Sequence, residues 1–273
     1  MRLGVEVGPF AASLDADFVR RYAAATADPS AKARTGVAVP PVAIATQIWD
    51  AQNEGRAALV SEDLARSATG GVHGEHDVVL HRPIRPGEPL RIRVSGQGAS
   101  PRGRNTMVTL RYVALDNDDT VVAEQWWTTV YLGVTADGIG DPAPDHAMRA
   151  ESRDRPVGSY VVDIDDDMAR RYAEVSGDWS DHHFDPEAAR RSGVDRIFLH
   201  GLCTMALCAQ GVVHLVADGD PDRLRRVAVR FAAPTFLGER LELHLYDAGP
   251  NTYAFEAQCA GANVITHGLA ELR

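Results

Sequence analysis

Hydrophobic and polar residues alternate in both halves of the chain, as in strands that are buried on one face. The alternation is clearest at Leu241, Leu243 and Leu245, and turn residues separate the segments at 116–119 and 249–251. The pattern predicts strands at residues 91–95, 107–115 and 121–132, and again at residues 226–231, 240–246, 253–260 and 265–272.

Residues 200–216 show a different pattern, because they are apolar on nearly every side of a helix. A helix without a polar stripe has to be covered on all its faces. Together the two patterns predict an α+β fold, in which an antiparallel sheet wraps around one central helix.

An internal repeat indicates that this unit occurs twice. The sequence Arg-Arg-Tyr-Ala stands at residues 20–23 and again at residues 170–173. At the same offset Asp28 corresponds to Asp178, so the register continues beyond the first match.

The segment between the two copies, residues 137–156, is rich in glycine, proline, aspartate and arginine and has no apolar period. Such a composition is typical of a linker. We therefore predict an N-terminal domain at residues 1–136 and a C-terminal domain at residues 157–273.

Composition and charge narrow the range of partners. A formal net charge of -10 argues against a nucleic-acid partner, since binding to phosphates needs a concentrated basic surface. The three cysteines are odd in number, and no apolar stretch has the length of a membrane span or a signal peptide. We expect a cytoplasmic protein without a membrane span.

The candidate chemistry lies in residues 172–186 and 199–202, which contain Asp178, His183 and Gly201. This stretch resembles the signature of the MaoC-like (R)-specific enoyl-CoA hydratases and their dehydratase relatives. In that family a Gly-Asp-x-Asn-Pro-x-His-x-Asp run supplies an acid/base pair, and a downstream His-Gly opens the central helix. Asp178, His183 and Gly201 match the family's aspartate, histidine and glycine.

The match departs from the family where Ser180 and Asp181 replace the usual Asn-Pro. Serine still forms hydrogen bonds, whereas Asp181 loosens the turn and adds a negative charge that would raise the basicity of His183. We assign Ser180, His200 and Leu202 to substrate binding, with His200 also stabilising the helix entrance.

The resemblance implies a double hotdog fold and reversible hydration of trans-2-enoyl-CoA to (R)-3-hydroxyacyl-CoA. No cofactor is implied beyond the carrier of the substrate, and a homodimer is compatible with it. In such a reaction water loses a proton while the α-carbon gains one, so a carboxylate and an imidazole that hold one water can share both transfers. A backbone N–H at a helix N-terminus, here that of Gly201, can stabilise the thioester oxyanion.

Other interpretations remain open. A biosynthetic dehydratase would act on a carrier-protein-bound or unusual acyl thioester, and a catalytically silent hotdog would only bind acyl-CoA. Taken singly, Asp178 is compatible with a turn residue and His183 with a core histidine. The neighbouring Asp181, His182 and Asp185 suggest a metal cluster, but adjacent residues point in different directions and no ligand set is completed, so we predict no metal.

The first copy keeps Asp28 but has Ala33 where the histidine should stand, and Pro40-Pro41 where the second copy has His200-Gly201. We therefore expect Asp28 to be catalytically idle, and the resemblance implies that the first half helps to form the acyl pocket. The histidines of residues 73–81 are interpreted as part of an exposed or edge strand.

Overall fold

The structure is a computed structural model that describes residues 1–273. Its strands form one antiparallel sheet in the order β1-β3-β4-β5-β2-β8-β11-β10-β9-β7, and β6 pairs with β3. The first half supplies β1 (Glu6–Ala12), β2 (Gly70–Leu80), β3 (Leu90–Arg102), β4 (Asn105–Leu115), β5 (Val121–Leu132) and β6 (Ile139–Gly140). The second half supplies β7 (Pro156–Asp163), β8 (Leu224–Phe231), β9 (Arg240–Gly249), β10 (Thr252–Cys259) and β11 (Ala262–Leu272).

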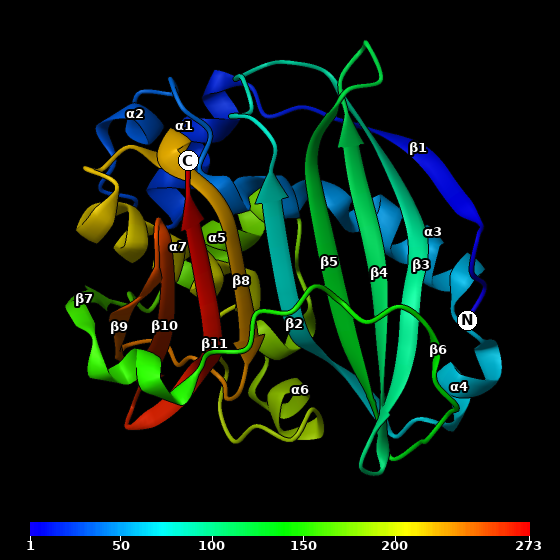
Figure 1. The fold of residues 1–273 in the computed structure, drawn as a ribbon. Helices are drawn as coiled ribbons and strands as arrows, with labels where there is room; N and C mark the ends of the chain where they lie inside the picture. Colours follow the sequence, from blue (N-terminus) through cyan, green and yellow to red (C-terminus); the bar gives the residue numbers. More distant parts are fainter.

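The helices lie on the inner face of this curved sheet (Figure 1). They are α1 (Ala16–Ala25), α2 (Ala31–Arg34), α3 (Trp49–Leu59), α4 (Glu62–Ser67), α5 (Met168–Ser176), α6 (Pro186–Arg191) and α7 (Gly201–Val216). Short 3₁₀ helices are η1 (Pro41–Ile48), η2 (Ala150–Asp154), η3 (Asp181–His183) and η4 (Pro221–Arg223). The predicted α+β class is confirmed, and the predicted central helix of the second half is α7, which is buried along most of its length.

The first half departs from the expected single apolar helix. Pro40 and Pro41 open a 3₁₀ segment, η1, and a regular α-helix begins only at Trp49. The two prolines stand at the start of the segment, where a missing N–H breaks no helical hydrogen bond, and the 3₁₀ geometry continues to Ile48. Ile44 and Ile48 are nevertheless fully buried.

The repeat places matching elements against each other. Helices α1 and α5 pack together, and the repeat-related Tyr22 and Tyr172 meet edge to face at 6.1 Å between ring centroids. Strands β2 and β8 pair across the middle, where Glu75 contacts Arg230 and Asp77 contacts Arg226. The two halves therefore share one sheet.

This pairing corrects one prediction. The histidines of residues 73–81 were expected on an exposed or edge strand, but β2 lies at the centre of the sheet, and His76 is fully buried. The segment looked exposed because it carries Glu75 and Asp77, whose charges are matched by arginines from the other half of the chain.

The predicted linker crosses the outer face of the sheet, from β6 to η2 (Figure 1). His146 donates from Nδ1 to the carbonyl oxygen of His267 at 2.7 Å, and Arg226 donates to the carbonyl oxygen of Asp145 at 3.1 Å. These contacts hold the segment on the strands. No helix in the structure combines the length and the apolar character needed to span a membrane.

Candidate active site

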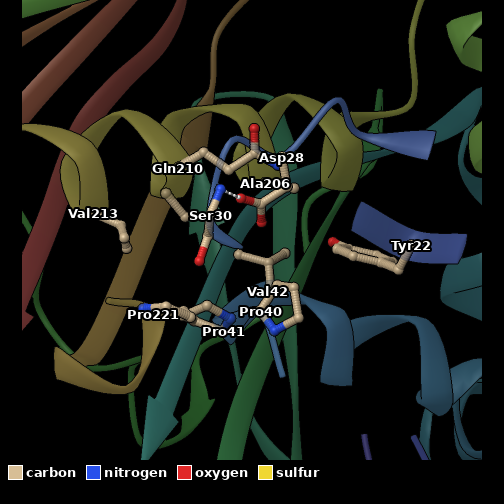
Figure 2. Close-up of a pocket in the computed structure, with 11 residues that line it drawn as sticks. Tyr22, Asp28, Ser30, Pro40, Pro41, Val42, Ala206, Gln210, Val213 and Pro221 are labelled. Atoms are coloured by element: carbon tan, nitrogen blue, oxygen red, sulfur yellow. Dashed lines mark hydrogen bonds between the residues drawn. The ribbon is translucent and has the colours of Figure 1, made fainter. Parts of the chain in front are cut away.

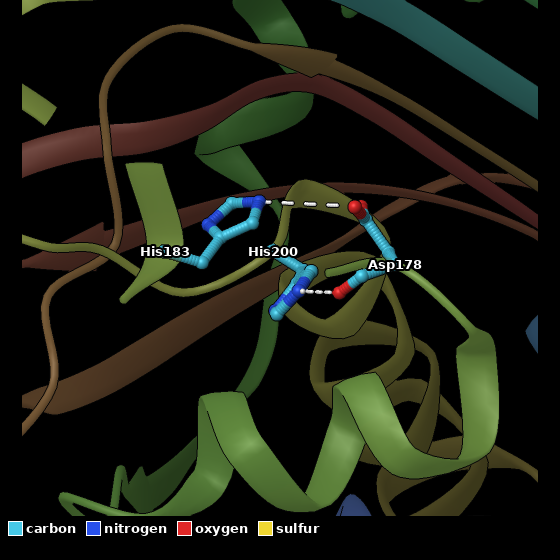
Figure 3. A group of neighbouring side chains, drawn as sticks. All are labelled: Asp178, His183 and His200. Atoms are coloured by element: carbon cyan, nitrogen blue, oxygen red, sulfur yellow. Dashed lines mark hydrogen bonds and ion pairs between the residues drawn. The ribbon is translucent and has the colours of Figure 1, made fainter. Parts of the chain in front are cut away.

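Asp178 lies directly after the C-terminus of α5. Gly177 ends that helix with a φ of 78°, in the left-handed region that glycine adopts without strain. Both the N–H and the hydroxyl of Ser180 donate to Oδ1 of Asp178, at 3.1 and 2.6 Å. The other carboxylate oxygen, Oδ2, is left to face His183 at 4.0 Å (Figure 3). Ser180 thus orients the carboxylate.

His183 is held in η3 with 4% of its surface exposed. Its Nδ1 lies 2.8 Å from the carbonyl oxygen of Phe198, which can only accept a hydrogen bond. Nδ1 must therefore carry the proton in the neutral ring, and Nε2, which faces Asp178, presents a lone pair.

Burial lowers the pKa of His183 to about 3, and the rings of His200 and His182 act in the same direction. Asp181, expected to make His183 more basic, acts instead on the neighbouring His182, and the carboxylate that opposes the effect of burial on the pKa of His183 is Asp178. A neutral imidazole and a carboxylate therefore face each other, acceptor to acceptor. One water molecule, with two O–H donors, satisfies both.

This arrangement predicts the pH dependence of activity. His183 works as a base only when it is neutral, and that form is lost only as the pH falls through its lowered pKa. We expect no acid limb in kcat/KM from His183 near pH 6.5, the range of an ordinary histidine, and a neutral ring down to about pH 5. NMR titration of the labelled imidazole, assigned with His183→Ala, checks this; a midpoint near 6.5 would contradict it.

His200 holds the backbone of Asp178. Its Nε2 donates to the carbonyl oxygen of Asp178 at 3.0 Å, and its ring lies 3.7 Å from that of His183 between centroids (Figure 3). With 2% of its surface exposed, His200 positions the backbone of Asp178. The structure shows this contact, while the predicted contact with substrate stays a prediction.

Gly201 is the first residue of α7, as predicted, and Leu202 follows it in the buried first turn. The N–H groups of the first turn have no partner within the helix, and they point out of its positive end. A Cβ atom on Gly201 would meet Cε1 of Phe231 at 3.3 Å, so glycine allows this ring to pack on the start of the helix.

Asp178, His183 and His200 each offer a ligand atom within 4.8 Å of the others, which raises the question of a metal ion. The rings of His183 and His200 are tilted by 31° to each other at a centroid distance of 3.7 Å. In addition, Nε2 of His200 is engaged with a carbonyl oxygen. Nδ1 of His200 has no hydrogen-bond partner, so the absence of a metal stays a prediction. Asp185, considered earlier as a ligand, caps α6 instead.

In the first half, the position related to Asp178 keeps one of its hydrogen bonds. Asp28 accepts a hydrogen bond from the N–H of Ser30 at 2.8 Å, as Asp178 does from Ser180 (Figure 2). Ala33 offers no imidazole, and the cavity beside Asp28 has room for about one water molecule. Burial raises the pKa of Asp28 to about 6. Nothing there pairs the carboxyl group with a base.

A sheet of two related halves, each curled around its own helix segment, defines a double hotdog protein. A solved Mycobacterium tuberculosis protein described as a double hotdog fold superimposes with a TM-score of 0.60 at 15% identity, covering 100% of this chain and 96% of that one. A MaoC-like dehydratase from Phytophthora capsici superimposes with a TM-score of 0.83 at 21% identity, covering 97% and 95%. At such identities the likeness concerns the fold alone.

Residues 149–268, in the second half of the chain, match the model of the MaoC-like domain. The mouse peroxisomal multifunctional enzyme type 2 is 25% identical over 205 residues, 74% of this chain and 27% of that protein. A probable enoyl-CoA hydratase 2 of Dictyostelium discoideum is 31% identical over 134 residues, 48% of this chain and 46% of that protein. The matched part is thus less than half of each of these relatives. The resemblance first noted in the sequence is confirmed.

Proposed function

We propose that the protein catalyses reversible addition of water to a trans-2-enoyl thioester, giving a (R)-3-hydroxyacyl thioester. The observation that carries this proposal is the pair of acceptors, Oδ2 of Asp178 and Nε2 of His183, facing each other across 4.0 Å beside the N-terminus of α7. The names of the relatives, which include hydratases and 3-hydroxyacyl-thioester dehydratases, support the same reaction class.

In the proposed reaction the water oxygen forms a bond to C3, and one of its protons passes to the pair. The electrons of the double bond move toward the thioester oxygen, where the N–H of Gly201 stabilises the negative charge. The pair then returns one proton to C2, so its own charge is unchanged after each turnover. Dehydration runs through the same steps in reverse.

The stereochemistry of the product follows from this geometry. Because one water and one acid/base pair serve both carbon atoms, the hydroxyl group and the proton add to the same face of the double bond. We expect syn addition and, from the family relationship, the (R) alcohol. Hydration in heavy water followed by NMR and chiral chromatography checks both points, and an (S) product would contradict the assignment.

The remaining alternatives are separated by the choice of substrate. Loss of enoyl absorbance with trans-2-enoyl-CoA distinguishes an enzyme from a silent acyl-CoA-binding protein. A comparison of CoA thioesters with the same acyl groups on a carrier protein then distinguishes the hydratase from a biosynthetic dehydratase. Faster turnover of the carrier-bound form would favour the dehydratase.

A further inference from the structure

Three ring nitrogens without hydrogen-bond partners are buried in the interior of the first half: Nε2 of His73, Nδ1 of His76 and Nε1 of Trp49. The rings of His73, His76 and Trp49 each pack against Trp127, at centroid distances of 3.6, 5.5 and 5.7 Å respectively. Buried polar atoms are nearly always paired, so a group of three that are not paired indicates a missing partner.

A bulge in β2 brings both histidines to this place. On a regular strand residues 73 and 76 would face opposite sides, and Glu75 and Asp77 do face the outer side, where they meet arginines. The pairing of β2 with β5 slips between His73 and Glu75, which adds one residue at Gly74. The extra residue turns His73 inward beside His76, and bulges near functional sites often redirect a side chain in this way.

Glycine is required at the bulge for reasons of space. A Cβ atom on Gly74 would stand 2.6 Å from Cγ2 of Val130 on β5. The inward position of His73 therefore depends on a close approach of backbone to side chain that only glycine allows.

The protonation of the rings can be read from their partners. The side-chain N–H of Gln125 donates to the carbonyl oxygen of Ile44, so its Oε1 is free to accept from Nε2 of His76 at 3.2 Å. Burial lowers the pKa of His76 to about 4, so the ring is neutral and its Nδ1 is a bare acceptor. Trp49 can only donate. The three nitrogens therefore include a hydrogen-bond acceptor, Nδ1 of His76, and a hydrogen-bond donor, Nε1 of Trp49.

The cluster lies close to the candidate active site. The ring of Phe231 is 4.7 Å from that of His73 between centroids, and the same ring packs on Gly201 at the start of α7. One aromatic ring therefore separates the cluster from the backbone N–H that would hold the thioester oxygen. An acyl chain that entered the first half from that oxygen would have to pass Phe231 on its way to the cluster.

We propose that the acyl group carries a hydroxyl group on the part that enters the first half, bound by His73, His76 and Trp49. A hydroxyl group donates and accepts, as these rings require, whereas a plain alkyl chain would leave all three nitrogens unpaired. This inference rests on the proposed hydratase function, and it adds the class of acyl group that the site selects.

The test compares trans-2-decenoyl-CoA with positional isomers that carry one hydroxyl group on the distal half of the chain. For at least one isomer we expect a specificity constant about tenfold or more above that of the plain thioester. His76→Phe and Trp49→Phe should each lower this ratio about tenfold toward unity. The control His81→Phe, at the partly exposed end past β2, should leave the ratio unchanged.

The outcomes separate the two proposals. Equal specificity constants for all thioesters in the unmodified protein would overturn the hydroxyl inference and leave the hydratase function in place. If no thioester is hydrated, the hydratase function fails, and calorimetric binding of the saturated forms of the same acyl-CoA pairs decides the inference. Tighter binding of a hydroxylated form that is lost in His76→Phe supports it, and equal or absent binding overturns it.

Discussion

Replacement of Asp178 by Asn should lower the turnover number of hydration about a hundred- to ten-thousand-fold, the usual contribution of a positioned acid or base. Asparagine keeps the oxygen that accepts from Ser180, so the loop stays in place while the acceptor facing His183 is lost. His183→Ala should have an effect of similar size. Because both groups act on one water, the double variant should be little worse than either single variant.

The chain contains a matched control for this experiment. Asp28→Asn makes the same substitution at the repeat-related position, where the aspartate has the same hydrogen bond from the N–H of a serine but no histidine. Turnover should stay within a few-fold of the parent protein. Loss of activity in folded Asp28→Asn comparable to that in Asp178→Asn would show that both halves take part in the chemistry.

Gly201→Pro should lower kcat about a hundred- to a thousand-fold, because it removes the N–H proposed to stabilise the oxyanion. Proline is well tolerated at the first position of a helix, and His200 already has the extended backbone, φ -56° and ψ 136°, that a residue before proline adopts. The fold should therefore survive the change.

Gly201→Ala is the control for size. It adds the same Cβ, which meets Phe231 at 3.3 Å, but keeps the N–H. We expect a loss of less than about tenfold, since this ring needs to move only slightly. Equal losses in the two variants, with circular dichroism showing intact folds, would mean that crowding against Phe231 and not the missing donor limits the reaction.

The local pattern of apolar and polar residues was enough to predict the strands that bury one face and the helix that buries every face. The alternating strands and the apolar helix α7 were predicted because burial imposes a period that the sequence displays. The edge strands β1 and β7 were missed because no residue of β7 and only Ala12 of β1 is buried, so neither strand has a strongly apolar face. The slip at Gly74 was missed as well, because a bulge depends on the partner strand.

The site was predicted in part for a similar reason. Spacing in the motif indicated that Asp178 and His183 lie together, and the structure brings them to 4.0 Å. It did not indicate the direction of the pKa of His183, which depends on burial by distant segments. Their catalytic roles stay predictions until the variants are measured.

The joining of β2 to β8 within one chain has a consequence for how this protein can diverge. In a dimer of identical subunits every mutation appears twice, once on each side of the symmetry axis. Here the two sides are encoded separately, so one can carry Ala33 and a bulge at Gly74 while the other carries Asp178 and His183. Two halves within one chain are thus free of that symmetry, and each can change its residues without changing the other.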